Sequence, residues 1–167
     1  SVNTIVSLVV VQQPSNANAG RPFVTPFSVA GIDAGANVVP SPLLSVVFSV
    51  ISVDPIVTDG TSTYPLTTGI ATASNFILNT PSSGVLLRAS LVSTPLITVV
   101  SAVFTVLRGF PNSIVFIRQP ALNRVANVPF TSLETPQIQL LDTANNPLST
   151  LDAGSFVNLT LVNGTNG

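Results

Sequence analysis

Hydrophobic positions alternate with polar ones or run in short bursts along the chain, and proline, glycine or asparagine interrupts them every 8 to 15 residues or so. No stretch keeps the spacing of three and four residues that marks an amphipathic helix. The pattern predicts strands at 5–12, 27–32, 44–53, 70–78, 85–92 and 96–107, with a further short strand at 62–66. Six or seven short strands in about 100 residues predict an all-β protein with a β-sandwich fold.

Short motifs of the first part of the chain return later in the same order, with a period of about 106 to 109 residues. This period is the size of one sandwich domain. We therefore expect one β-sandwich over 1–107, a short linker over 108–112 and the first half of a second repeat of the same kind over 113–167. The matched pairs are 9–14 with 115–120, Pro22-Phe23 with Pro129-Phe130, Ile32-Asp33 with Leu141-Asp142, and Ala36-Asn37 with Asn145-Asn146.

The second repeat stops after about three strands, so we expect its apolar face and sheet edges to need covering. Residues beyond 167, chain without fixed structure, or strands of an adjacent subunit would each provide that cover. The segment 1–11 is a β-forming stretch without charge. It is either the first strand of its own sandwich or an arm exchanged with a neighbour, which would join copies head to tail.

Only 7% of the residues are charged, against about 25% in an ordinary soluble domain. A surface so poor in charge predicts cover by copies of the chain or by covalent glycans. The net charge of −1, without a basic cluster, argues against nucleic-acid binding. The longest apolar runs, 43–53 and 96–107, are too short for a membrane span.

Catalysis has few candidate groups in this sequence. The chain contains no His, Lys or Cys, so the usual nucleophilic triads cannot form. A two-carboxylate glycosidase needs paired acids in a cleft, usually with aromatic walls, and the chain has one Tyr and no Trp. We expect no enzyme activity, no cofactor and no metal site.

The acidic residues are dispersed, and each is alone in its stretch of sequence. Side chains of this kind at a strand end are typical of turns closed by side-chain to backbone hydrogen bonds. We interpret Asp33, Asn37, Asp142 and Asn145 as structural turn residues. The alternative is a calcium site between domains, built from Asp33 and Asp142 with Asp54, Asp59 and Asp152.

Several hydroxyl and amide groups are candidates for glycosylation. Two sites match the acceptor pattern for N-linked sugars, Asn158 and Asn163. Asn158 belongs to an alternating stretch, 156–162, whose polar face would carry a sugar outward. Four hydroxyls beside prolines are candidates for O-linked sugars: Ser41, Thr80, Thr94 and Thr135.

The order of motifs along the chain resembles tandem bacterial-type immunoglobulin-like repeats. Residues 8–106 match one whole unit and residues 114–160 the first half of another; Ala126-Asn127 replaces Ala19-Gly20 in the second. The carriers are Gln13-Pro14, Ala19-Gly20, Asp33, Asn37, 69–76, 87–90 and 101–106.

The resemblance implies a structural or adhesive protein outside the cell or on its surface. Repeats of this family serve as spacers and assembly units in adhesins, surface-layer-like proteins and the filaments or appendages of microbes and algae. We expect a structural subunit or spacer of a filament, appendage or surface layer. The alternatives are an adhesin stalk or ligand-binding module of a cell-surface protein, and an accessory domain of a secreted hydrolase.

Overall fold

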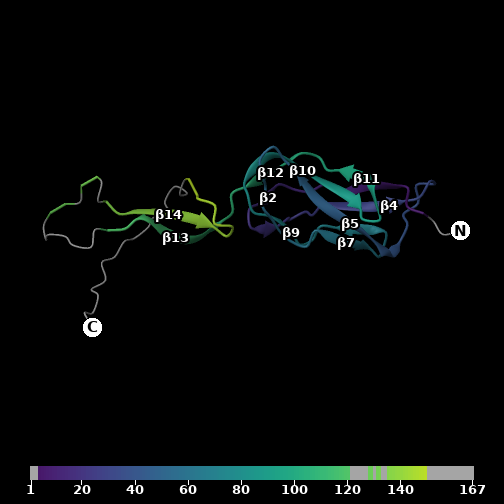
Figure 1. Ribbon diagram of the computed structural model, residues 1–167, viewed down its shortest axis with the longest axis horizontal. Helices are drawn as coiled ribbons and strands as arrows, with labels where there is room; N and C mark the ends of the chain where they lie inside the picture. Colours follow the sequence, from purple (N-terminus) through teal and green to yellow (C-terminus); the bar gives the residue numbers. More distant parts are fainter. Residues whose placement is uncertain (1–3, 121–127, 130, 133–134, 150–167) are drawn as a thin grey trace, which may run out of the picture.

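The computed structural model describes residues 4–120, 128–129, 131–132 and 135–149. All regular secondary structure in these residues is β, and no helix occurs in them. A sandwich-like body ends at Leu107, and a two-stranded hairpin extends from one end of it (Figure 1). The all-β sandwich predicted from the sequence is therefore confirmed.

The body contains twelve short strands in the described part of the chain. They are β1 (Ser7–Gln12), β2 (Ala17–Asn18), β3 (Arg21–Pro22), β4 (Ser28–Ile32), β5 (Ser41–Ile51), β6 (Thr58–Gly60), β7 (Thr63–Leu66), β8 (Ile70–Thr72), β9 (Phe76–Leu78), β10 (Ser82–Leu91), β11 (Thr94–Val100) and β12 (Phe104–Leu107). The hairpin consists of β13 (Pro111–Arg118) and β14 (Gln137–Asp142).

The strands of the body form three sheets. One has the order β1-β4-β8, a second has the order β2-β12-β10-β5-β7 with β11 also paired to β10, and a small third has the order β3-β9-β6. Neighbours are antiparallel except β2 and β12, which are parallel. The largest sheet centres on β10, which pairs with β5 along Leu86–Leu91.

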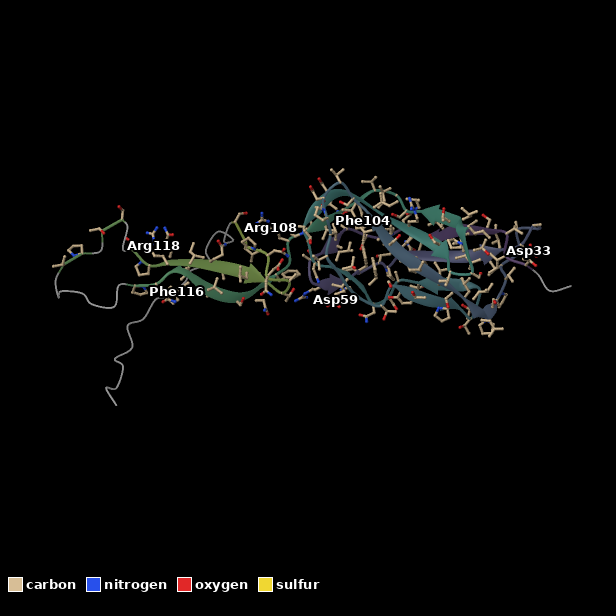
Figure 2. The ribbon with its side chains drawn as sticks, in the orientation of Figure 1. Asp33, Asp59, Phe104, Arg108, Phe116 and Arg118 are labelled. Atoms are coloured by element: carbon tan, nitrogen blue, oxygen red, sulfur yellow. The ribbon has the colours of Figure 1, made fainter. Side chains whose placement is uncertain are left out.

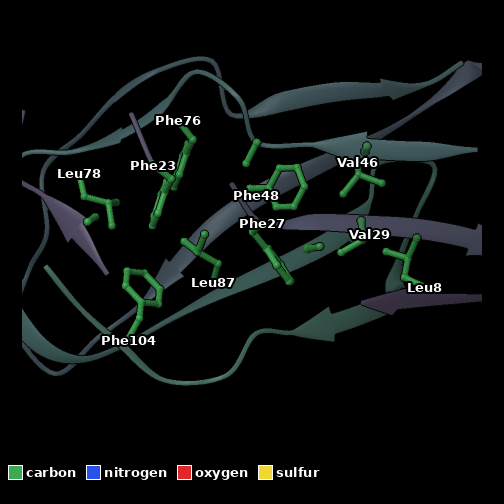
Figure 3. Close-up of a cluster of buried hydrophobic side chains, with 14 of the residues drawn as sticks. Leu8, Phe23, Phe27, Val29, Val46, Phe48, Phe76, Leu78, Leu87 and Phe104 are labelled. Carbon is green, nitrogen blue, oxygen red and sulfur yellow. The ribbon is translucent and has the colours of Figure 1, made fainter. Parts of the chain in front are cut away.

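One hydrophobic core lies between the sheets (Figure 3). Along β10, Val85, Leu87 and Ala89 are fully buried while their neighbours are more exposed, which is the alternation of a strand with one face on the core. The rings of Phe27 and Phe48 meet edge to face, with centroids 5.6 Å apart. Such ring pairs add about 0.5–1.5 kcal/mol to the stability gained by burial.

Two of the predicted strands are each divided in the structure. The stretch 70–78 forms β8 and β9 in different sheets, separated by a turn in which Ser74 N donates to Thr72 O. The stretch 96–107 forms β11 and β12, which both pair with β10. The break falls at buried Ser101, whose hydroxyl accepts from Leu87 N at 2.9 Å and donates to Ala102 O at 2.8 Å.

The first segment of the chain belongs to its own sandwich in this structure. β1 pairs antiparallel with β4, from Ser7 opposite Ile32 to Gln12 opposite Ser28. Ile5 and Leu8 are buried in the core of the same body.

Candidate functional site

The hairpin meets the sandwich at a short connection, in which Arg108, Gly109 and Phe110 join β12 to β13. The turn after β14 lies against the end of the sandwich at Ala19-Gly20 and Asn79. We call this region the junction; it comprises Ala19, Gly20, Asn79, Arg108, Gly109, Asp142, Thr143, Ala144 and Asn146. It is the region in which the hairpin is held against the end of the sandwich.

Asp142 holds the turn on the hairpin side of the junction. Its Oδ1 accepts from the backbone N–H groups of Ala144 and Asn146, both at 2.9 Å. The side-chain amide of Asn146 donates to the same carboxylate at 3.1 and 3.0 Å. Asn145 takes the left-handed conformation, with φ of 63°, which asparagine tolerates better than most residues. The Asn146 side chain thus makes the amide hydrogen bonds of this turn, whereas Asn145 provides the backbone bend and donates its backbone N–H to Asp142 O at 3.0 Å.

Hydrogen bonds also cross the junction. Gly109 N donates to Asp142 Oδ2 at 2.8 Å, and Asn146 Nδ2 donates to Asn79 O at 2.7 Å. The Thr143 hydroxyl donates to Ala19 O at 3.4 Å. Asp142 is fully buried as a result, and its carboxylate accepts hydrogen bonds from both the linker and its own turn.

Two glycines allow the close approach of the backbones. Gly20 has φ of 77°, and a Cβ there would lie 2.5 Å from Thr143 Oγ1. A Cβ on Gly109 would lie 2.5 Å from Ala19 O and 3.0 Å from Asp142 Cβ. The two 2.5 Å distances are shorter than real Cβ contacts, so at either position a side chain would force the hairpin turn and the sandwich end to shift apart.

The rim of the junction is closed by arginine side chains. The guanidinium of Arg21 lies over the ring of Phe110, 4.7 Å from its centroid. Arg108 Nη1 donates to Pro147 O from the linker side. Ala144 packs against the hydrophobic core of the sandwich. Contacts at an exposed rim such as the cation–π pair contribute about 0.5–1 kcal/mol.

The buried position of Asp142 acts on its acidity in two directions. Burial raises the pKa of the carboxyl, but hydrogen bonds from Asn146, Gly109 and Ala144 together outweigh burial, so the pKa lies below its ordinary value of 3.8. The carboxylate is therefore charged at neutral pH.

Asp33 forms a similar turn at the opposite end of the sandwich (Figure 2). Its Oδ1 accepts from Gly35 N and Asn37 N, both at 2.9 Å, and from Asn37 Nδ2 at 3.1 Å. The backbone hydrogen bond from Asn37 is the main reason why the pKa of Asp33 is also lowered. The two turns lie at the two ends of the sandwich and do not form one site.

From Ser113 to Arg118 the hairpin has the same register as the β1–β4 pair of the sandwich, and it has one further irregularity of its own, between Pro111 and Ser113. Ser113 faces Leu141 as Ser7 faces Ile32, and both pairs shift register at the same place, before Arg118 and Gln12 respectively. The apolar side chains of β13 are exposed, whereas Leu8 of β1 is buried. The exposed residues of β13 are Ile114, Val115, Phe116 and Ile117.

The candidate glycosylation positions fall in different surroundings. Asn158 and Asn163 lie outside the described residues, as does Asp152. Thr94 is exposed at the start of β11, and Thr135 is exposed with its hydroxyl donating to Thr131 O at 2.9 Å. Thr80 and Ser41 are half-buried, and Thr80 Oγ1 accepts from Val57 N at 3.0 Å.

The acids considered for calcium that lie in the described residues do not converge. Asp54 and Asp59 are exposed, and Asp59 accepts a hydrogen bond from Gly60 N. Within the residues that the structure describes, no group of three acidic, histidine or cysteine side chains could hold a metal ion. The same residues include no helix with the length and hydropathy that crossing a membrane requires.

Comparison of the chain with known protein families, with curated proteins and with solved structures finds no match. The junction must therefore be understood from its own geometry. Sequence reasoning identified Asp142 as a turn residue but gave no role to Asn79 or Gly109 there. The available signal was the glycine in the linker, since a glycine between two strands often marks a close backbone approach.

Proposed function

We propose that the chain is a structural subunit or spacer of an extracellular filament, appendage or surface layer, built from tandem immunoglobulin-like domains. The observation that carries the proposal is the junction, in which buried Asp142 ties the hairpin to the end of the sandwich. A spacer transmits position along its length, so it needs fixed joints between its units. The chain would act mechanically and without catalysis or a cofactor.

The register of the hairpin supports a tandem arrangement. A second unit that begins as the first one does would form its first strand pair with the same register and the same irregularity, as β13 and β14 do. The sequence motifs that return in order are the independent support. We infer that β13 and β14 begin a second sandwich.

The surface of the sandwich supports packing against neighbours or cover by sugars. Val53 is 99% exposed, and Leu43 and Leu96 are each 93% exposed. Few charges interrupt this surface, because only 7% of the residues are charged. Copies of the chain or glycans on hydroxyls such as that of Thr94 would reduce its contact with water. Such cover fits a location outside the cell or on its surface.

The alternative is an adhesin stalk or ligand-binding module of a cell-surface protein. Recognition of a glycan or protein usually employs exposed aromatic rings. Tyr64 is half-buried, and its hydroxyl is engaged with Thr61 O and Asn75 N at 2.8 and 3.0 Å. The exposed rings in the described residues are Phe110 and Phe116, on the linker and hairpin. This distribution favours the structural proposal over the adhesin.

Electron microscopy of the native, unfractionated material, with intact-mass analysis of the same sample, tests the proposal. We expect regular filaments or layers and a subunit mass greater than that calculated from the polypeptide sequence. Unmodified, monodisperse monomers would contradict the structural role and support the adhesin or an accessory domain of a secreted hydrolase.

A further inference from the structure

The Asp33 turn reproduces the hydrogen bonds of the Asp142 turn. In each, the aspartate Oδ1 accepts from the backbone N–H groups two and four residues later, at 2.9 Å in all four cases. In each, an asparagine amide donates to that oxygen at 3.1 Å. The residue before that asparagine has φ of 62° in one turn and 63° in the other. The two turns therefore present the same backbone shape.

The two turns differ in their surroundings. The Asp142 turn is seated on the Gly20 and Asn79 end of the sandwich, where Asp142 Oδ2 also accepts from the linker. In the described part of the chain, the Asp33 carboxylate accepts hydrogen bonds from Gly35 and Asn37, both within its own turn. Ala34, Gly35, Ala36 and Asn37 are all exposed.

The Asp33 turn is small enough to fit the surface of the sandwich end that the Asp142 turn contacts. We call this surface, which includes Gly20 and Asn79, the seat. Ala34 stands in the place of Thr143, the residue that most closely approaches Gly20. Gly35 stands in the place of Ala144, whose backbone is also within contact of Gly20. Asn37 matches Asn146, which donates to Asn79 O. The substitution removes the Thr143 hydroxyl bond and introduces no larger side chain.

The Asp33 turn and the Gly20 and Asn79 surface lie at opposite ends of the sandwich. Asp33 lies at one end of the sandwich, and Arg108 of the junction lies at the other (Figure 2). A turn at one end and its seat at the opposite end cannot meet within one domain. Repeated contacts of this kind join units head to tail in an open series.

We propose that the Asp33 turn is a docking element for the Gly20 and Asn79 end of a second copy of this sandwich placed ahead of it in the same chain, a copy whose end is not already filled by an Asp142 turn of its own. The contact would repeat the junction, with Asp33 Oδ2 accepting from the linker that enters its own domain. This inference deepens the proposed structural role. It rests on that role because it requires successive units to meet end to end. It names the interface through which they would do so.

A tandem chain tests the docking, with residues 1–109 placed before residues 4–167. Gly109 lies four residues before Ser113, so it takes the place of residue 3, four residues before Ser7, and the native spacing is kept. Because the sequence has no cysteine, introduced thiols are unique. One pair is Asn79→Cys in the added copy with Ala34→Cys in the full one. A calibrating pair at the native junction is Asn79→Cys with Thr143→Cys in the full copy.

Treatment with a short thiol crosslinker should link the new pair with a yield similar to that of the calibrating pair. Adding Asp33→Ala should lower the yield of the new pair roughly tenfold, because hydrogen bonds to a charged group are lost. Asp54→Ala is the matched control, since Asp54 is an exposed acid outside the turn, and it should leave the yield unchanged.

The proposal is overturned if the new pair links no better than its Asp33→Ala variant while the calibrating pair reacts. Hydrogen exchange along β5 and β10 checks that every variant has a folded sandwich. A negative result would leave the proposed structural role open, because units of a filament can meet through other surfaces. Native filaments with a negative crosslinking result would therefore refute the docking alone.

Discussion

At the scale of single residues, the junction depends on a position that has no side chain. Gly20 has a left-handed backbone, and because it has no side chain Thr143 and Ala144 can lie close to it. Gly84 also has a left-handed backbone, with φ of 69°, but an added Cβ there would meet nothing within 4 Å. The two glycines thus separate backbone strain from loss of the contact.

We expect Gly20→Ala to open the junction, whereas Gly84→Ala should impose backbone strain alone. That strain is about 1–2 kcal/mol for a non-glycine residue in the left-handed region. Hydrogen exchange of the Gly109 amide, which donates to Asp142, is the measurement. Exchange should accelerate in Gly20→Ala and stay close to that of the wild type in Gly84→Ala. Equal acceleration in both variants would show that the close contact has no role in closing the junction.

At the scale of elements, the alternation of hydrophobic residues predicted which stretches form strands but not where each strand ends. The pattern predicted β4 and β7 to within one residue, because each is short and lies between turn-forming residues. It missed β2, β3 and β6, which have two or three residues and carry no readable period. The division of 96–107 depends on a hydrogen bond from Leu87, a residue outside that stretch.

Dependence on residues distant in the sequence also limits what the sequence reveals about the junction. The Asp33 and Asp142 turns are local, because each acid bonds groups within four residues of itself, and the sequence predicts them as turns. The seat for the Asp142 turn combines Gly20, Asn79 and Gly109, which come from three separate parts of the chain. Only the folded arrangement brings these residues together.

Ser101 provides the prediction at the scale of elements. Ser101→Ala removes the acceptor of Leu87 N in the buried centre of β10, and an unsatisfied buried N–H costs about 1–3 kcal/mol. For a domain of this size, each kcal/mol lowers Tm by roughly 4–8 °C. Calorimetry should therefore show a loss of several degrees in Ser101→Ala and almost none in Ser49→Ala, which removes an exposed hydroxyl of β5. Matching transitions in the two variants would contradict a structural role for the Ser101 hydroxyl.

At the scale of the whole molecule, the junction determines whether the hairpin and the sandwich keep one orientation. The Asp142 carboxylate is the group that links the Gly109 amide to the Asn146 turn. Its pKa in the folded protein lies below the ordinary value of 3.8, so its stabilising effect is present above that value and is lost as the pH falls through the lower, folded pKa. A fixed joint at neutral pH should therefore loosen in strong acid.

Replacement of the carboxylate tests this joint in the intact chain. In Asp142→Asn, an amide N–H₂ or a single carbonyl oxygen must replace two accepting oxygens, so either Gly109 N or the turn loses its acceptor. Small-angle scattering should show a broader range of end-to-end dimensions for Asp142→Asn at every pH, and for the wild type only in acid. Asp33→Asn alters the matching turn at the far end and should scatter as the wild type does near pH 7. If Asp142→Asn retained the narrow distribution of the wild type at neutral pH, the contacts of Arg108 and Thr143 would have to hold the orientation of the hairpin instead. The acid transition would then have to be assigned to another group.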